Sequence, residues 1–251
     1  MARARVYERM LNSMRTYFRL LGRSSEGAHV VELPGVMGSV VPAVPDRSLP
    51  NSVVYESQEA LVTALPELAR RYEEAGVQAW TVWTPEDDEQ AIAGLRDAGH
   101  SLDADPAAMT FDLAELDEPP AIDYRTGDDL IPVVAGINDR AYPVDGAPFT
   151  RLSSEQPHGV TENYVTYLDG DPAACLEIIR VDGDASVWAV ATLPTARGQG
   201  LCARLMHRAL WDAREDGCDI STLQATKLGE PIYARLGYQS HGAIQMWEKR
   251  R

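Results

Sequence analysis

The 251-residue sequence has only three cysteines, no long apolar run and far fewer basic than acidic residues. Cys175, Cys202 and Cys218 show no paired metal-ligand spacing and cannot make a closed set of disulfides. We therefore expect no metal site and a reducing, cytoplasmic setting. No stretch approaches the roughly 18 apolar residues that a membrane helix requires, so no membrane span is expected.

The charge balance is 23 Lys and Arg against 38 Asp and Glu, a formal net charge of −15. Because DNA and RNA binding depends on Lys and Arg neutralising phosphates, this balance argues against general affinity for nucleic acid. A cationic partner suits an acidic protein better. A hydrophobic fraction of 45% and a charged fraction of 24% are typical of a globular protein.

The N-terminal segment is an exception to this acidity. Residues 1–23 carry six arginines against the single Glu8, and apolar residues recur there at near-helical spacing. The pattern fits a transit peptide or an amphipathic helix packed with its basic face outward. No secretory apolar core or cleavage pattern follows, so we predict the packed helix.

A boundary between two units is predicted at Pro119 and Pro120. Consecutive prolines cannot continue a helix or a central strand, and the acidic residues before them keep the joint solvated. We therefore divide the chain into residues 1–118 and 119–251. Oligomeric state cannot be predicted from this sequence.

The two units show a similar order of elements. In the second unit we expect strands at 121–125, 164–168, 173–180, 186–193, 220–224 and 243–247, and helices at 128–139, with Asp128 as N-cap, 201–215 and 230–236. Hairpin turns are expected at Asp169-Gly170 and Asp182-Gly183. In the first unit we expect helices at 61–75 and 86–98 and strands at 77–83 and 109–113.

Glycines match between these endings, Gly76 with Gly217 and Gly99 with Gly237, which indicates an internal repeat. We predict an α/β (α+β) protein of two related units, each with a mixed, mostly antiparallel sheet flanked by helices.

The turn at Arg197-Gly198-Gln199-Gly200 is the strongest chemical signal. It lies between a predicted strand and an amphipathic helix that starts at Leu201. Glycines let successive N–H groups converge, and the start of a helix adds unpaired donors and the positive end of its dipole. The turn therefore predicts a diphosphate site. The first unit has no such turn.

Residues 121–251 resemble the GNAT superfamily of acetyl-CoA-dependent N-acyltransferases. The family signature is Gln/Arg-x-x-Gly-x-Gly/Ala after a strand, followed later by a Tyr four residues before a Gly-Phe/Tyr pair. The residues that match it are Arg197, Gly200, Tyr233, Gly237 and Tyr238. Two residues depart from the pattern, because Cys202 replaces the usual Gly or Ala, and Thr226 replaces an Asn or Ser that touches the cofactor.

The resemblance implies that acetyl-CoA, or another acyl-CoA, is the co-substrate. It implies that backbone groups of Val190, Ala191 and Thr192 bind the pantetheine arm. The diphosphate would lie against Gly198, Gln199, Gly200, Leu201, Cys202 and Ala203, with Arg197 and Arg204 supplying positive charge. Thr226 would contact the same cofactor. The resemblance therefore implies two GNAT-like units in tandem, of which the first is degenerate because it lacks the cofactor motif.

Acyl transfer requires a proton donor for the departing thiolate, and by position Tyr233 matches the family's donor. Its phenol has a pKa of about 10 against about 8.5 for a thiol, so the transfer is modestly uphill unless the site shifts either value. The alternative is that Tyr233 only packs its helix on the sheet. A backbone N–H near Thr192 would polarise the carbonyl.

No residue is an evident base for the amine. Glu177, Glu162 and His158 are candidates, with Glu177 preferred, although each also fits a solvated strand face. Cys202 could act as a nucleophile at a helix start or simply fill a tight turn. The prediction is acetyl transfer to a small-molecule or protein amine. A non-catalytic acyl-CoA sensor, or transfer to a thiol or hydroxyl, stays open.

Overall fold

The structure of the protein is a computed structural model that describes residues 3–142 and 144–251. The elements of the N-terminal half are α1 (Arg3–Leu21), β1 (His29–Leu33), β2 (Val36–Val40), β3 (Ser52–Tyr55), α2 (Gln58–Glu74), β4 (Ala79–Pro85), α3 (Glu89–Asp97), β5 (Ser101–Ala104), β6 (Ala107–Asp112) and the 3-10 turn η1 (Leu113–Glu115).

The elements of the C-terminal half are β7 (Tyr124–Thr126), η2 (Asp128–Leu130), α4 (Ile131–Ala141), α5 (Pro148–Leu152), β8 (Glu162–Leu168), β9 (Asp171–Val181), β10 (Asp184–Thr192), η3 (Pro194–Ala196), α6 (Leu201–Glu215), β11 (Ile220–Ala225), α7 (Glu230–Arg235) and β12 (Gln239–Arg250). None of the described helices is long and apolar enough to cross a membrane.

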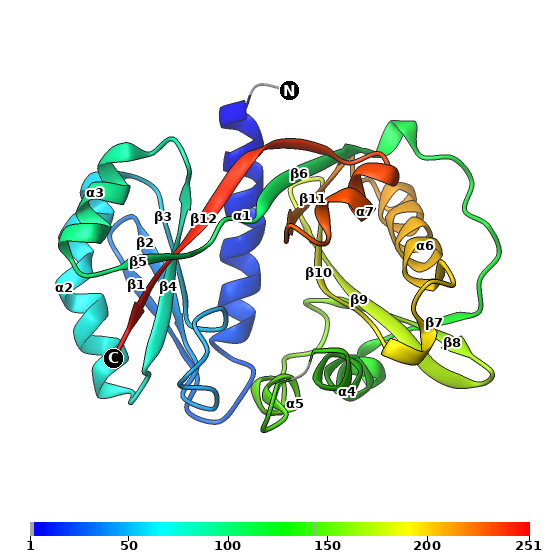
Figure 1. Ribbon diagram of the computed structural model, residues 1–251, viewed down its shortest axis with the longest axis horizontal. Coiled ribbons are helices and arrows are strands. Elements are labelled where there is room, and N and C mark those ends of the chain that lie inside the picture. The colour runs from blue at the N-terminus through cyan, green and yellow to red at the C-terminus, as the bar shows by residue number, and fades with distance from the viewer. Residues whose placement is uncertain (1–2, 143) are drawn as a thin grey trace.

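The strands form one mixed sheet in the order β1-β2-β3-β4-β12-β6-β11-β10-β9-β8-β7, with β5 paired to β12. Among the described strands only β3 with β4 and β10 with β11 run parallel. Helices α2 and α3 flank the N-terminal strands, and α6 and α7 lie over the C-terminal ones (Figure 1). The structure therefore confirms a mixed, mostly antiparallel sheet flanked by helices.

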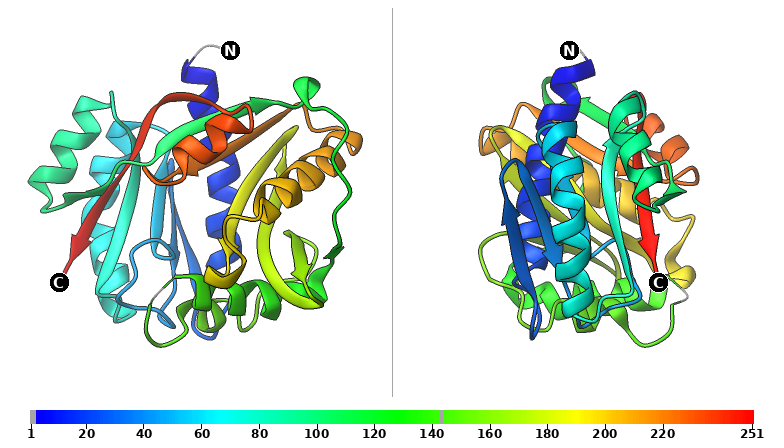
Figure 2. Two further views of the ribbon diagram at one scale, coloured as in Figure 1. Left: turned by 45° about the vertical axis from the view of Figure 1, so that its right-hand side comes forward. Right: turned by 90° about the vertical axis from the view of Figure 1, so that its left-hand side faces the viewer.

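The two halves exchange strands. β6 comes from the N-terminal half but pairs with β11 of the C-terminal half. β12 pairs with β6 over its first residues and then with β4 and β5, so it crosses from one half to the other (Figures 1 and 2). Each predicted unit, 1–118 and 119–251, thus contributes a strand to the sheet of the other, and the boundary itself stays a prediction.

Helix α1 lies between the halves and packs on both. Its apolar residues share a buried cluster with side chains of β2, β4, β9, β10 and β12. Ser13 donates to Asp184 over 2.6 Å at the start of β10, and Arg9 pairs with Asp219 over 2.8 Å. The packed amphipathic helix predicted for this segment is therefore confirmed.

The hairpin turns have the predicted chemistry. Asp169 and Asp182 have φ of 53° and 49°, and the glycine after each also has a positive φ, as type I′ turns require. The predicted N-cap was wrong: Leu130 occupies the N-cap position of α4, with no side-chain cap. Asp128 instead begins η2, and its carboxylate accepts a hydrogen bond from the N–H of Gly159. The carboxylate is therefore bonded to a loop far along the chain instead of capping the helix.

Gly237 is required by the exchanged strand. Its φ is 103°, and a Cβ on it would lie 2.6 Å from Cε2 of Phe111 in β6. A side chain here would meet both backbone strain and an aromatic ring. The Gly-Tyr pair after α7 therefore has a packing reason beyond its place in the family signature.

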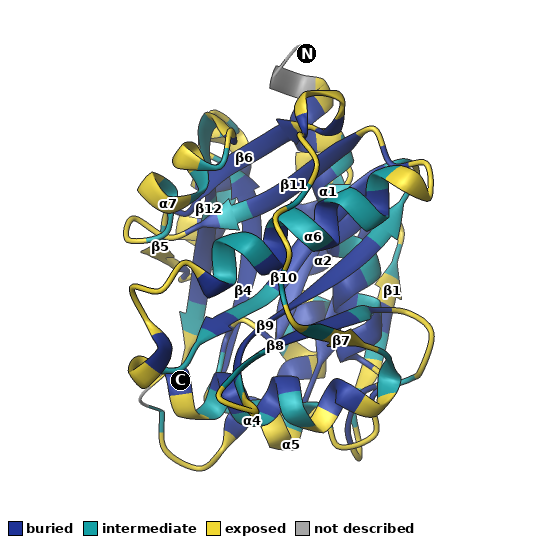
Figure 3. Cartoon of the chain, turned by 90° about the vertical axis from the view of Figure 1, so that its right-hand side faces the viewer, coloured by how far each residue is buried: buried dark blue, intermediate teal, exposed yellow. Residues whose placement is uncertain are grey.

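The C-terminal part of the sheet has two covered faces. Leu176 and Ile178 of β9 pack with α6, whereas Cys175 packs with α4 and Ile179 with α1. Since side chains alternate along a strand, Glu177 shares the face that α1 and α4 cover. Figure 3 shows these strands buried beneath α6, while the loops at their ends are exposed.

Candidate active site

The site lies where β10 and β11 separate. The two strands pair in parallel only from Asp184 with Ile220 to Ser186 with Thr222, but β10 continues to Thr192. Beyond Ser186 the edge of β10 that faces β11 therefore has no strand partner among the described residues. An open edge of this kind can receive an extended, amide-rich ligand, as in strand addition.

A β-bulge interrupts β10 along this open edge. The register of β10 with β9 shifts between Trp188 and Ala191, and Ala189 has φ of 48°. Trp188 and Ala189 consequently both face the side that α1 and α4 cover, while Val190 faces α6. A left-handed Ala costs on the order of 1 kcal/mol, so the surrounding structure must hold it.

The predicted diphosphate turn lies directly beyond the open edge. Gly198 and Gly200 have φ of 77° and 70°, and no atom lies within 4 Å of a Cβ placed on either. Gly200 is the N-cap of α6, with no side-chain cap and no acidic residue in the first turn. The first N–H groups of α6, from Leu201 to Ala203, therefore have no helical acceptor and are available to an anion.

Arg197 and Tyr142 bond to carbonyls of the open edge. Arg197 donates through Nε to the Thr192 carbonyl over 3.2 Å and through Nη2 to the Ala141 carbonyl over 3.0 Å. The Tyr142 hydroxyl donates to the Val190 carbonyl over 2.9 Å. Sequence reasoning missed Tyr142, because it lies in a loop with no recognisable motif and only the fold brings it to β10.

Tyr233 lies on α7, half-buried against the cluster under α6. Its ring packs edge-on to Tyr238 with centroids 5.9 Å apart. Burial raises the pKa of its phenol well above 10, and the nearby Cys202 and Tyr142 raise it further. Tyr233, Cys202 and Tyr142 thus lie close enough to interact electrostatically, and the Tyr233 phenol keeps its proton at neutral pH.

Cys202 and Thr226 have local partners. Burial raises the pKa of the Cys202 thiol to about 11, so a helix start does not activate it as a nucleophile and packing explains it better. The Thr226 hydroxyl accepts a hydrogen bond from the Gly229 N–H over 3.2 Å. It orders the loop before α7, and its contact with a cofactor stays a prediction.

The base candidates differ in their surroundings. Glu177 is 5% exposed and lies opposite Trp188 of β10. Burial raises the pKa of its carboxyl to about 7, against a hydrogen bond from Gln156. Glu162 is paired with Arg180, and the exposed His158 approaches Asp128. Glu177 lies on the opposite face of the sheet from Tyr233, so the structure does not place the two predicted catalytic residues side by side.

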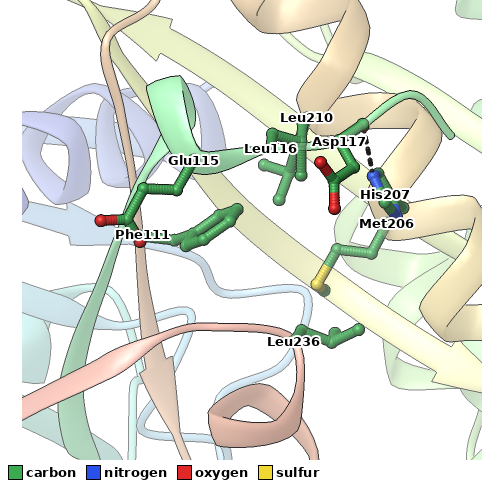
Figure 4. Close-up of a pocket in the computed structure, with 8 residues that line it drawn as sticks. All are labelled: Phe111, Glu115, Leu116, Asp117, Met206, His207, Leu210 and Leu236. Atoms are coloured by element: carbon green, nitrogen blue, oxygen red, sulfur yellow. Dashed lines mark hydrogen bonds between the residues drawn. The ribbon is translucent and has the colours of Figure 1, made fainter.

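A cavity of about 110 Å³ lies elsewhere, between η1 and α6 (Figure 4). Its walls include Phe111, Met206, Leu210 and Leu236, and His207 Nε2 bonds to the Asp117 carbonyl over 2.7 Å at its rim. None of the predicted site residues lines it. No group of His, Cys, Asp and Glu within 3–142 and 144–251 could hold a metal ion.

Comparison with known proteins decides the family of this site. Residues 161–240 match the model of the acetyltransferase (GNAT) domain. They contain the bulged strand, the glycine turn, α6 and Tyr233. The C-terminal half contains a GNAT domain. A comparison with curated proteins finds no match.

Solved structures resemble the whole chain, not only the GNAT domain. A GCN5-related N-acetyltransferase from Kribbella flavida is 20% identical with a TM-score of 0.65, over 94% of this chain and 95% of that chain. A functionally unknown protein from Staphylococcus epidermidis is 16% identical with a TM-score of 0.63, over 88% and 93%. At these identities the likeness shows the fold.

A tandem GNAT protein from the clavulanic acid biosynthesis pathway is also similar. It is 12% identical with a TM-score of 0.54, over 95% of each chain. These three structures match 88%, 94% and 95% of this chain, so the likeness in fold extends beyond the residues that match the GNAT domain model.

Proposed function

We propose that this protein is an acetyltransferase that moves an acetyl group from acetyl-CoA to an amine. The observation that carries the proposal is the succession of backbone groups along the chain: the open edge of β10 is followed, after the short turn η3, by the glycine turn and the uncapped start of α6. An amide-rich arm followed by a diphosphate suits this succession of backbone groups. Arg197 and Arg204 add positive charge locally.

The donor would be bound mainly through the backbone. Val190, Ala191 and Thr192 would receive the pantetheine, and residues 198–203 the diphosphate. Because the Tyr142 hydroxyl occupies the Val190 carbonyl, the pantetheine amide would replace it there. Thr226, beyond the end of β11, would contact the cofactor from the other side of the gap.

The chemistry asks for two proton transfers. The amine nitrogen forms a bond to the thioester carbon, the carbon–sulfur bond breaks, and Tyr233 gives its proton to the leaving thiolate. Burial raises the pKa of the Cys202 thiol to about 11 and raises the pKa of the Tyr233 phenol as well, so a thiolate in this environment would be more basic than in water, but the proton transfer from Tyr233 would stay uphill. A backbone N–H at the bulge would stabilise the oxyanion.

Glu177 would accept the amine proton, directly or through water, from the face opposite Tyr233. Donor and acceptor would then approach from opposite faces of the sheet, and the proton would have to pass between β10 and β11 where the two strands no longer pair. The net charge of −15 suits a cationic acceptor. Transfer to a thiol or hydroxyl, or acyl-CoA sensing without turnover, are the alternatives.

The N-terminal half would be a degenerate GNAT-like copy. Its parallel pair β3 with β4 would correspond to β10 with β11, and the fully buried Leu95 would correspond to Tyr233 of the second unit. Without a glycine turn it would support the sheet and the acceptor side rather than bind a second donor.

The binding test is isothermal titration of the full chain with acetyl-CoA. One site per chain is expected, with thiol release on adding amines from a panel of polyamines, amino sugars and lysine peptides. Absence of acetyl-CoA binding would overturn the proposal. Binding without thiol release above a no-acceptor control would favour the sensor.

The pH profile tests the base. With the pKa of Glu177 at about 7, turnover should rise with pH through neutrality, because only the carboxylate accepts a proton. Glu177→Gln should lose this rise and slow turnover about 100-fold. Glu162→Gln is the matched control and should keep the wild-type profile. A Glu177→Gln enzyme with an unchanged profile would exclude this role.

A further inference from the structure

Asn138 is a buried polar residue that the proposed chemistry does not use. It lies on α4, is 1% exposed, and faces the strands of the C-terminal half. Its Nδ2 donates to the Val134 carbonyl over 3.0 Å and to the Ala189 carbonyl over 3.1 Å, with Cys175 Sγ at 3.4 Å. These acceptors around one nitrogen fix the orientation of the amide.

The bond to Ala189 falls on the strained residue of the bulge. Ala189 has φ of 48°. Its carbonyl points toward α4 and accepts a hydrogen bond from Nδ2 of Asn138. Oδ1 of Asn138 is buried and has no hydrogen-bond partner within the described residues. A buried oxygen without a hydrogen-bond partner lowers the stability of the fold. The hydrogen bonds that the Asn138 nitrogen donates therefore give the reason for an amide at this position.

Holding the Ala189 carbonyl also sets the direction of the next N–H. The peptide between Ala189 and Val190 is trans and planar, so the Val190 N–H points opposite to the Ala189 carbonyl, away from α4. Ala191 pairs with Cys175 of β9, and its backbone hydrogen-bonds to the Cys175 side chain. The backbone N–H and carbonyl of Val190 therefore point to the open edge, where the carbonyl accepts a hydrogen bond from the Tyr142 hydroxyl.

We propose that Asn138 is a positioning residue that keeps the bulge of β10 in its left-handed conformation and so aims the Val190 N–H at the thioester carbonyl. This inference rests on the proposed acetyltransferase function. It assigns the hydrogen bond to the oxyanion to the N–H of Val190. It also means that α4, on the face of the sheet opposite α6, positions this N–H through Asn138. Asn138 itself touches neither substrate.

The test compares acetyl-CoA with CoA, because only the first has the carbonyl that Val190 would bind. Titration of the unchanged protein should give acetyl-CoA about 5-fold tighter binding than CoA, the value of one hydrogen bond. Asn138→Leu should bring the two affinities together while leaving CoA binding unchanged. Its kcat should fall at least 10-fold, whereas its KM for acetyl-CoA should rise by no more than the about 5-fold loss of affinity.

The double variant separates positioning from folding. Glycine adopts a positive φ without strain, so Asn138→Leu with Ala189→Gly should regain most of the preference for acetyl-CoA and most of the kcat. Asn51→Leu is the matched control, because Asn51 is a buried asparagine that bonds to the Val41 N–H and to the Val44 and Arg47 carbonyls in the other half. It should lose stability but keep the preference for acetyl-CoA.

The outcomes distinguish the two proposals. If the unchanged protein binds neither ligand, the acetyltransferase proposal fails and the role of Asn138 fails with it. If both ligands bind equally, or Asn138→Leu keeps the preference, the donor site stands and the inference about Asn138 is overturned. Failure of Ala189→Gly to restore a folded Asn138→Leu protein would also overturn it.

Discussion

Tyr233→Phe should bind acetyl-CoA as the unchanged protein does and turn it over about 100-fold more slowly. Loss of a general acid typically costs a factor of 10² to 10⁴, because the thiolate must leave unprotonated or take a proton from water. The ring that packs against Tyr238 is kept, so the fold and the donor site should be unaffected. Stopped-flow measurement of thiol release and titration with acetyl-CoA would measure the two effects separately.

Tyr238→Phe is the control for this prediction. Tyr238 is in the same aromatic cluster and its hydroxyl lies 2.6 Å from the Ser221 hydroxyl, so its loss should cost about 1 kcal/mol of stability. Turnover should change little, because this hydroxyl is buried beneath α7. Equal turnover of Tyr233→Phe and the unchanged protein would leave Tyr233 as a packing residue and remove the acid from the mechanism.

Gly200→Asp should weaken acetyl-CoA binding about 10-fold to 100-fold relative to Gly200→Asn. Both residues tolerate the φ of 70° at this position, and no atom lies within 4 Å of the added Cβ. They differ in charge, and a carboxylate beside a diphosphate costs about 1–3 kcal/mol at a partly exposed site. High salt should reduce the difference between the two variants.

The free energy of unfolding should not follow the acetyl-CoA affinity of these two variants: the Asp variant should bind more weakly but be at least as stable as the Asn variant. A carboxylate at the start of α6 interacts favourably with the helix dipole, by about 0.3–1 kcal/mol, so the Asp variant should unfold at equal or higher denaturant concentration than the Asn variant. Weaker binding by a protein that is no less stable would locate the diphosphate at this helix start. Equal affinity of the two variants would place the diphosphate elsewhere.

Much of the fold follows from local sequence signals. The helix at Leu201–Glu215 has the bounds that the sequence predicts, because an apolar stripe of helical period begins directly after a glycine turn. The Asp-Gly hairpin turns are equally local, since both residues in each need a positive φ. The strands β1, β2 and β3 were not predicted. They are short, and their partners in the sheet define them more than their own sequence does.

For the site, the sequence by itself determined which segment carries the GNAT-like motif. Glycine at a left-handed turn, a helix start without an acidic residue, and a tyrosine before a Gly-Tyr pair are properties of short stretches, so a linear pattern contains them. Arg197, Gly200 and Tyr233 are therefore recognisable from the order of residues alone.

Only the tertiary structure decided what surrounds that segment. The exchange of β6 and β12 between the halves, the opposite faces of Glu177 and Tyr233, and the contacts of Asn138 and Tyr142 with β10 join residues far apart in the chain. No local pattern encodes such contacts, because each depends on the register and bulge of a strand whose partners lie elsewhere in the sequence. The motif segment is therefore a property of the sequence, and the residues that surround it are decided by the fold.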